Sequence, residues 1–425
     1  MSSSFSTSPE SLASSPGSTL LRVPTDNGSN KIRSLRWGIL GCGRVSHDFC
    51  LAVHSAFGIR DASAPADDKT APPVIVACAS ASSASSASSF ASRHSIPRSY
   101  GSYSALLADP DVDVVYVGTV HRTRLRDATA VISAGKHLVL EKPFALNYED
   151  AVAIVAKARE AGVFCMEGMW TRFFPVLRHV AENVLSDGEE GLGGIVQITS
   201  DFHFNTEDSE KYPDSPLYSF KLAGGAAMYV APYPLHVATM LLGRTPLAIS
   251  AVGRVDTGTG VDLQASVSLA YPALVPDENK KNDERPRPNV GPLASLHYGF
   301  LTESGETTSI LCERGRITIN GPSHCPTSVT VERKLPGRGE KETKTTNFPL
   351  PVQCGAVAEG DGETMEYFYP NSAGFAYEAA AVCRHIAAGK LEAPECPLDD
   401  TLAVMKILDE VRKQIGMDIP KEAEI

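Results

Sequence analysis

The feature that most constrains this chain is a glycine-rich turn between a short apolar run and an amphipathic stretch. The apolar run 36–40 suits a buried strand, and apolar residues then recur at helical spacing over 45–57. One glycine permits a tight turn, the next lets backbone N–H groups approach a pyrophosphate, and the helix N-terminus adds partial positive charge. Ser46 replaces the usual third glycine and is small enough for helix–strand packing. We therefore expect the turn to bind a dinucleotide through Gly41, Cys42, Gly43, Arg44 and Val45.

Strand-like and helix-like segments alternate from this turn to residue 168. The expected strands cover 74–80, 112–120, 137–143 and 163–168. Beyond about residue 190, strand-like segments mostly follow one another directly, several with period-two alternation. Alternating elements require a parallel, doubly wound sheet, whereas consecutive strands favour an antiparallel one. The predicted fold is α/β: an N-terminal Rossmann doubly wound parallel sheet plus a C-terminal α+β domain with a large open, mostly antiparallel sheet.

The chain divides into three predicted parts. Residues 1–34 are rich in Ser and Pro, a composition that cannot offset chain entropy, so we expect a disordered tail. Residues 35–165 form the expected dinucleotide-binding domain, and 166–425 the substrate and dimerisation domain. One helix is expected early in the second domain at 229–243, and two more near the C-terminus, at 372–389 and 399–416, with their packing against the first domain left open. Loops are predicted at 59–73, 276–292 and 335–346.

Composition excludes several classes of protein. Lys and Arg total 39 against 50 Asp and Glu, and the resulting charge of −11 argues against binding to nucleic acid. No apolar stretch approaches the ~18 residues of a membrane helix. The nine cysteines are scattered without a CxxC pair, which favours neither a disulfide framework nor a metal site. We expect free, mostly buried thiols in a reducing, cytoplasmic setting.

The residues after the second strand bear on the choice of cofactor. NAD sites usually place an acid there, whereas this chain has Ser80 and Ser82. Without that carboxylate a 2′-phosphate meets no repulsion, which favours NADP and leaves NAD possible. A basic clamp would require Arg93 or another distant cation. The alternative is that the two serines only begin a helix.

The ends of the next two strands carry the candidate chemistry. Ligands of open α/β sheets bind at the carboxyl ends of strands. Thr119 and His121 follow the third strand, and Glu141 and Lys142 end the fourth. We expect all four to contact the cofactor, with Lys142 beside the nicotinamide. The competing interpretations are a surface lysine and a loop histidine.

Several motifs occur in one order: GILGCGRVS (38–46), EKPFALN (141–147), MEGMWTRFFP (166–175), GGAAMYVAPYPLH (224–236) and a C-terminal series from GFAYEAAAV (374–382). Through them the chain resembles the Gfo/Idh/MocA oxidoreductase family from Leu35 to Pro420. Its nearest likeness there is the dimeric dihydrodiol dehydrogenase and NADP-dependent D-xylose 1-dehydrogenase group. The resemblance implies a Rossmann domain, a second domain whose open sheet supports a homodimer, and a Lys142 that works at the reacting centre.

The resemblance also implies an acid/base residue. Ungapped alignment with the family motif GGGALLDIGxYP places Tyr233 on its tyrosine, Tyr229 on its Asp and Ala231 on its Gly. Two further departures are the absence of Thr-Pro after the third strand and Ala81 where NADP members often have Arg. Oxidation of an alcohol requires a base for the hydroxyl proton, and a neighbouring ammonium favours a phenolate.

Four other residues receive roles by the same resemblance or by spacing. His236, three residues after Tyr233, is a possible proton relay or simply a helix histidine. Trp170 and Arg172 resemble residues that line the substrate pocket, with structural packing as the alternative, and Tyr229 is expected to shape that pocket.

Two functions follow from these residues. The first is an NADP-dependent dehydrogenase or reductase acting on the CH–OH group of a sugar, polyol or small cyclic alcohol. The second is a catalytically altered dinucleotide-binding regulatory or sensor protein, which the changes at Tyr229 and Ala231 motivate.

Overall fold

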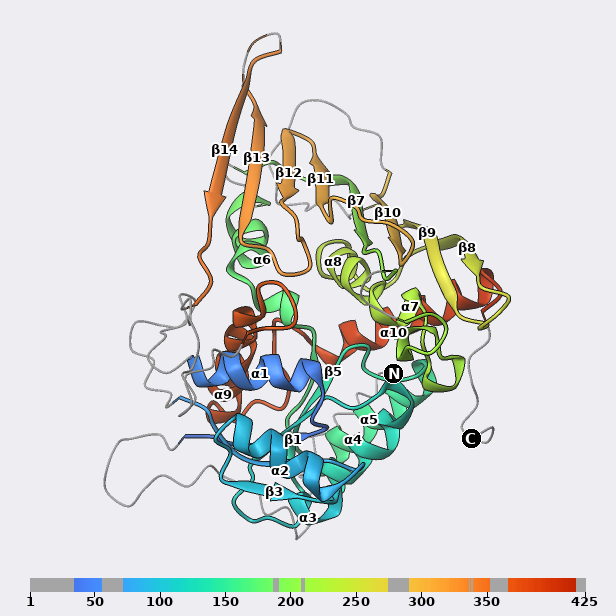
Figure 1. Cartoon of the computed structure of the whole chain (residues 1–425). Coiled ribbons are helices and arrows are strands. Elements are labelled where there is room, and N and C mark those ends of the chain that lie inside the picture. Colours follow the sequence, from blue (N-terminus) through green and yellow to red (C-terminus); the bar gives the residue numbers. More distant parts are fainter. Residues whose placement is uncertain are drawn as a thin grey trace, which may run out of the picture.

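The computed structural model describes two sheets and the helices around them (Figure 1). The described residues are 34–55, 72–185, 191–207, 211–273, 290–335, 337, 339–351 and 366–417. The tail predicted at 1–34 and the loops predicted at 59–73 and 276–292 lie almost wholly outside them.

The first sheet has six strands in the order β3-β2-β1-β4-β5-β6, and every pair is parallel. Its apolar strands are buried on both faces, as helices on both sides require. This order confirms the predicted doubly wound sheet, with its switch point between β1 and β4. The strands are β1 (Arg36–Leu40), β2 (Val74–Ala79), β3 (Arg98–Tyr100), β4 (Val114–Val117), β5 (His137–Glu141) and β6 (Cys165–Gly168).

The helices of this sheet follow the expected alternation. They are α1 (Arg44–Ser55), α2 (Ala84–Arg93), α4 (Arg124–Ser133) and α5 (Tyr148–Ala161). The sequence did not indicate the short β3 or the five-residue α3 (Tyr103–Leu107), because neither is long enough to show a period.

The second sheet has eight strands in the order β14-β13-β12-β11-β7-β10-β9-β8. Only β7 and β10 pair in parallel, so the prediction of a mostly antiparallel sheet is confirmed. The strands are β7 (Ile195–His203), β8 (Ala248–Val255), β9 (Asp262–Ala270), β10 (Leu293–Gly299), β11 (Thr308–Cys312), β12 (Gly315–Ile319), β13 (Ser328–Lys334) and β14 (Lys341–Asn347).

One local prediction is wrong. The loop expected over 335–346 contains β14, which pairs with β13 as the edge of the sheet. Its KETKTTN sequence shows no apolar alternation because nearly all its side chains are exposed, as suits a charged edge strand. The helix expected over 229–243 is confirmed as α8 (Pro232–Leu242), and a short α7 (Ala226–Tyr229) that was not expected precedes it. Pro232 starts α8, where its missing N–H costs nothing.

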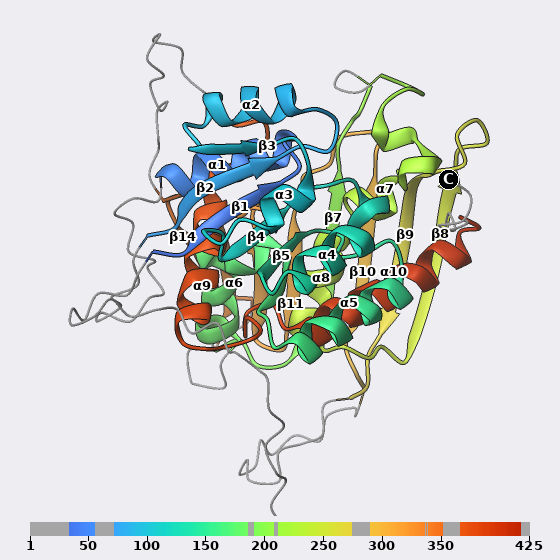
Figure 2. The same ribbon diagram turned by 90° about the horizontal axis from the view of Figure 1, so that it is seen from below.

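Helices from the second half of the chain lie between the two sheets. α7 and α8 pack on β9, β10 and β7 of the large sheet, and α10 (Leu398–Gln414) packs on α8 and also on α5. Figure 2 shows α10 running beside α5. α9 (Phe375–Ala387) packs against α1. A short α6 (Pro175–His179) follows the turn after β6. Lys142, directly after β5, reaches the last residue of α7, Tyr229.

The cysteines and helices of the described segments agree with two expectations from composition. All eight cysteines in these segments are free, and seven are buried. No helix there is long and apolar enough to cross a membrane.

Candidate active site

The glycine turn after β1 has the geometry that phosphate binding needs. Gly41 has φ +91, and a Cβ there would lie 2.9 Å from the backbone oxygen of Gly118. A Cβ on Gly43 would meet nothing within 4 Å, so open space lies beside the N-terminus of α1. A Cβ on Gly118 would clash with Ser46 Oγ, which shows how closely α1 approaches the end of β4. Ser46 thus packs as the third glycine of such turns does.

The side chains after β2 form a small hydroxyl cluster. Ser80 Oγ lies 2.8 Å from Ser82 Oγ, and both flank the expected ribose position. Arg93 is the last residue of α2, nine residues and about 13 Å along the axis from its start, which argues against it as the cation considered for a 2′-phosphate. The Cys42 thiol contacts Ala79 O at 3.5 Å, and its hydrogen bond with Cys78 lowers the pKa of Cys42.

Lys142 reaches from the end of β5 toward both tyrosines of the second domain. Its Nζ donates to the backbone oxygen of Tyr229 at 2.7 Å. The same atom lies 4.7 Å from the ring centroid of Tyr233 and 5.9 Å from that of Tyr229. Burial lowers the pKa of Lys142 from 10.5 to about 8. The half-buried ammonium is therefore poised near neutral pH, although it is still mostly charged at pH 7.

Two residues fix the backbone on either side of Lys142. Arg124, at the start of α4, donates from Nη1 to the backbone oxygens of Glu141 and Pro143. Glu141 accepts from Tyr116 Oη at 2.6 Å and from the Lys142 backbone N–H at 3.1 Å, and burial raises the pKa of Glu141. Sequence reasoning missed Arg124, since no motif marks an arginine whose partners are backbone oxygens.

Tyr233 lies in the first turn of α8, directly beside Lys142. Burial and the neighbouring Glu141 raise the pKa of Tyr233 well above its ordinary value, with a hydrogen bond from Trp170 opposing them. This direction is opposite to the one expected from Lys142 alone. The tyrosine is thus a neutral phenol in the structure.

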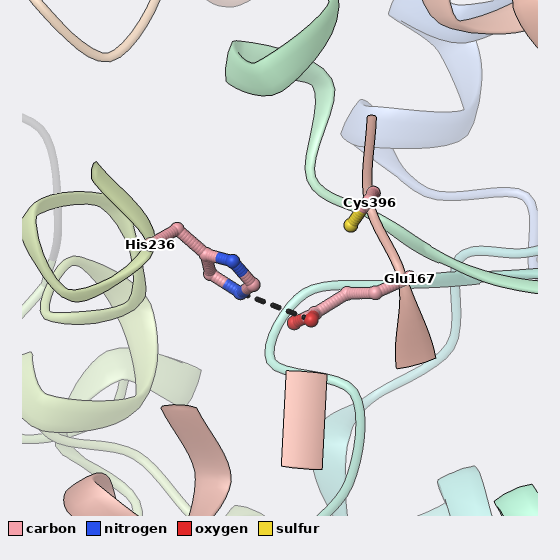
Figure 3. Close-up of side chains that lie close together, drawn as sticks. All are labelled: Glu167, His236 and Cys396. Atoms are coloured by element: carbon pink, nitrogen blue, oxygen red, sulfur yellow. Dashed lines mark ion pairs between the residues drawn. The ribbon is translucent and has the colours of Figure 1, made fainter. Parts of the chain in front are cut away.

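His236 points toward Glu167, a residue of β6 (Figure 3). Its Nε2 lies 3.0 Å from Glu167 Oε2, and neither side chain is more than 1% exposed. Burial lowers the pKa of His236. Burial alone would raise the pKa of Glu167, but His236 and a 2.7 Å hydrogen bond from Thr401 bring it below its usual range. A carboxylate and a neutral imidazole thus tie α8 to β6.

Cys396 completes a group of three ligand-type side chains with Glu167 and His236 (Figure 3). Their donor atoms all lie within 4.8 Å of one another. Burial raises the pKa of the Cys396 thiol, so this side chain is a thiol in the structure, whereas a metal ligand would be a thiolate. The expectation of no metal site stays a prediction.

Of the other predicted residues, Trp170 and His121 lie beside the two tyrosines, whereas Arg172 is held by contacts elsewhere. Trp170 stacks on Phe375 with centroids 4.4 Å apart, close to Tyr233. His121 contacts Ala223 O through Nδ1 at 3.0 Å, and its ring lies 4.6 Å from that of Tyr229. Arg172, by contrast, donates to Asp400 at 2.6 Å and to the backbone oxygen of His236 at 3.2 Å. These contacts indicate a structural role for Arg172 and do not support its placement in the substrate pocket. Thr119 lies beside Gly41.

A pocket opens beside Tyr233 between α8 and β7. Its volume is about 10 Å³, roughly the room that one water molecule needs. Sequence reasoning missed every lining residue except Tyr233, because they come from separate strands and loops without a motif. They are Ser200, Asp201, Phe202, Tyr233, Pro234, Val237, Ser323 and His324.

Two domain families match the chain. Residues 35–169 match an oxidoreductase family with an NAD-binding Rossmann fold, and residues 181–318 match the GFO/IDH/MocA C-terminal domain. The trans-1,2-dihydrobenzene-1,2-diol dehydrogenase of Sus scrofa is 32% identical over 92% of this chain and 99% of its own length. The enzyme of the same name from Homo sapiens is 30% identical with the same coverage.

Solved structures show the same fold at lower identity. A levoglucosan dehydrogenase in complex with NADH and levoglucosan is 19% identical with a TM-score of 0.69, covering 92% of this chain and 100% of its own. The 3-ketoreductase KijD10 from Actinomadura kijaniata, in complex with NADP and TDP-benzene, is 20% identical with a TM-score of 0.67, covering 90% and 98%.

Proposed function

Because the chain belongs to the Gfo/Idh/MocA oxidoreductase family, we propose that it is an NADP-dependent dehydrogenase or reductase of CH–OH groups in small cyclic diols, sugars or polyols. In this proposal Tyr233 is the acid/base residue and Lys142 contacts the reacting oxygen. The observation that carries it is the position of Lys142 Nζ, 4.7 Å from the ring of Tyr233 at the carboxyl end of β5.

In this proposal the chain's own side chains supply proton transfer and charge stabilisation. The nicotinamide, when bound, supplies the hydride acceptor or donor. In reduction the Tyr233 phenol would donate its proton to the substrate oxygen and become a phenolate; in oxidation Tyr233 would have to be a phenolate first, and that phenolate would accept the proton of the substrate hydroxyl. The Lys142 ammonium stabilises negative charge on that oxygen, and Arg124 holds the backbone on which Lys142 is placed.

The sensor alternative rests on Tyr229 and Ala231, and the contacts of Tyr229 weaken it. Lys142 donates to the backbone oxygen of Tyr229, an acceptor that any residue at this position would provide. The change from Asp therefore leaves Lys142 with a partner in place. We accordingly favour an active enzyme over a decayed one.

NADP is the proposed cofactor because no acid follows β2. Ser80 and Ser82 leave room for a phosphate where an NAD site would place a carboxylate. The structural relatives contain either NADP or NADH, so they do not indicate which cofactor this chain prefers. The proposal of NADP therefore rests on this chain's own residues. Fluorescence titration with NADPH and NADH tests it: tighter binding of NADH would defeat the NADP assignment.

The catalytic proposal is tested by turnover. Purified protein is assayed with NADP⁺ and NAD⁺ against cyclic trans-diols, levoglucosan and D-xylose, together with Tyr233→Phe. We expect the variant to lose about 100-fold or more in kcat while its NADPH affinity changes by less than about twofold. Tyr271→Phe is the matched control, since Tyr271 is buried outside the site and its hydroxyl contacts no described partner. Tight cofactor binding without turnover of any substrate would favour the sensor.

We also propose that the chain forms a homodimer through the outer face of the large sheet. Val252, Leu293 and Leu311 point outward from β8, β10 and β11 and are 76%, 52% and 39% exposed. Light scattering should give twice the chain mass for the wild type and a monomer for Val252→Lys. A monomeric wild type would exclude the dimer.

The free cysteines are the reason that we propose a reducing, cytoplasmic setting.

A further inference from the structure

The short helix α7 supplies the backbone oxygen that holds Lys142, and the break between α7 and α8 makes that oxygen available. In a continuous helix the Tyr229 oxygen would accept from the N–H of Tyr233, four residues further on. Tyr233 N instead donates to Val230 O at 3.2 Å. Lys142 Nζ is the group that donates to Tyr229 O, at 2.7 Å. The position of the Lys142 ammonium therefore depends on the position of α7.

Asp262, the first residue of β9, anchors the N-terminus of α7. Its side chain is fully buried, and its Oδ2 accepts from the Ala227 backbone N–H at 2.8 Å. The residue before the helix is Gly225, which has no side chain to cap it, so the carboxylate from β9 takes that role. A Cβ on Gly225 would clash with Asp262 Oδ1, which shows how closely the carboxylate fits against the start of α7.

Burying a carboxylate such as Asp262 costs stability, whereas an apolar residue would fill the same space without that cost. Asp262 Oδ1 has no hydrogen-bond partner among the described residues. Burial raises the pKa of Asp262 to about 7, although the Ala227 N–H and the Arg412 guanidinium oppose the shift. Arg412, on α10, also contacts Met228 Sδ through Nη1 at 3.2 Å, so α7 is held from a second side. An incompletely satisfied buried charge is typical of residues kept for function.

Resting on the proposed function, we propose that Asp262 is a positioning residue: by holding the N-terminus of α7 it places the Tyr229 backbone oxygen, which fixes the Lys142 ammonium for the reacting oxygen of the substrate. A lysine side chain is long and flexible, so a fixed acceptor determines where its ammonium lies. The same hydrogen bond favours the charged form of Lys142. Displacement of α7 should therefore lower both kcat and the pKa of Lys142.

Trace labelling of amines measures the effect on Lys142 without any substrate. The full chain is labelled with acetic anhydride between about pH 6 and about pH 10, and mass spectrometry follows the peptide that contains Lys142, since only the neutral amine reacts. The wild-type midpoint should lie at about pH 8. Asp262→Val removes both oxygens and keeps a side chain suited to a strand, and its midpoint should be lower by about one pH unit. A merely structural role of Asp262 would leave the midpoint unchanged.

Steady-state kinetics measures the effect on catalysis, with NADP⁺ and the best substrate among cyclic trans-diols, levoglucosan and D-xylose. We expect kcat of Asp262→Val to fall about tenfold while KM and the NADPH affinity change by less than about twofold, because the ammonium acts in the transition state. Tyr298→Phe is the matched control. It removes a buried hydroxyl without a described partner from the neighbouring strand β10, so kcat and the Lys142 midpoint should stay as in the wild type.

Asp262→Asn keeps the test decisive if thermal denaturation shows that Asp262→Val is unfolded. This variant is nearly isosteric and keeps an oxygen acceptor without the charge. A charge-assisted hydrogen bond is roughly twice as strong as a neutral one, so we expect about half the effect: a midpoint lower by about half a pH unit and a kcat lower by about threefold.

The outcomes separate this inference from the proposed function. A midpoint that stays at about pH 8 in the folded Asp262 variants overturns the positioning role and leaves the proposed dehydrogenase function intact. The same conclusion follows if kcat falls equally in Tyr298→Phe, since a general loosening of the sheet would then be the cause. A wild type that turns over none of the substrates overturns the proposed function, and with it the catalytic use of Asp262, whatever the labelling midpoints.

Discussion

Removing the Lys142 ammonium should make the protein more stable and nearly inactive. Lys142→Met keeps the length of the side chain and removes its charge. The depression of the Lys142 pKa from 10.5 to about 8 means that the folded protein binds this proton more weakly than the unfolded chain does. At 1.36 kcal/mol per pKa unit the difference is about 3 kcal/mol of destabilisation. Loss of the 2.7 Å hydrogen bond to the Tyr229 backbone oxygen costs the variant roughly 1.5 kcal/mol of stability. The free energy of unfolding should therefore rise by about 1–2 kcal/mol in total.

The direction of the Lys142 pKa shift determines how the stability difference between variant and wild type changes with pH. Below the folded pKa of about 8 both states carry the proton, and the whole penalty acts on the wild type. Between that value and 10.5 the folded protein loses the proton first, so wild-type stability rises with pH. The advantage of Lys142→Met should therefore be greatest near neutral pH and shrink as the pH approaches 10.5.

Urea unfolding without cofactor, followed by tryptophan fluorescence at about pH 7 and about pH 10, measures the two free energies of unfolding. Lys136→Met is the matched control: this buried lysine donates to the backbone oxygens of Asp109 and Val112 at 2.7 Å, outside the site. Burial lowers the pKa of Lys136 as well, but its loss removes two hydrogen bonds, so stability should fall while kcat/KM stays unchanged. A Lys142→Met variant less stable than the wild type at pH 7, or one whose advantage grows with pH, would refute the reasoning.

Three further changes test the framework of the site. Gly118→Ala should lower the free energy of unfolding by about 1–3 kcal/mol and weaken NADPH binding, because the new Cβ meets Ser46 Oγ. Adding Ser46→Gly should restore most of the stability and most of the NADPH affinity. If the double variant recovers neither, the clash is not the cause. Glu167→Gln should lower the free energy of unfolding by about 1–3 kcal/mol at pH 7 through its contact with His236. Because the Glu167 pKa lies below 4.5, that loss should diminish as the pH falls past 4.5, and a loss independent of pH would contradict an ionised Glu167. Arg124→Lys should lower kcat about tenfold with little change in NADPH affinity, since a lysine cannot hold two backbone oxygens in the same way; unchanged kcat would exclude a positioning role.

Local patterns were enough to predict the first sheet. Its strands are short apolar runs separated by helices, and, except for β3 and β4, strands that follow one another in sequence pair in the sheet. β14 was missed because an exposed edge strand buries too little to impose alternation on its residues. The four-residue α7 was missed because it is too short to show a helical period.

The candidate site divides in the same way. Gly41 and Lys142 were found because their positions after predicted strands give them a chemical meaning, and Tyr233 because a family motif carries it. Arg124, Glu167 and His324 were not found, since their partners are 17, 69 and 18 residues away and no local signal connects them.

The sequence by itself determined the glycine turn, the doubly wound sheet and the candidate pair of Lys142 and Tyr233, because strand ends and glycine turns are set by nearby residues. Only the tertiary structure decided the environment of that pair. Burial depresses the pKa of Lys142 and raises that of Tyr233, Glu167 rather than solvent holds His236, and His324 enters the pocket from a distant loop. Each of these depends on desolvation and on contacts between distant segments, and both arise only when the two sheets pack around α8.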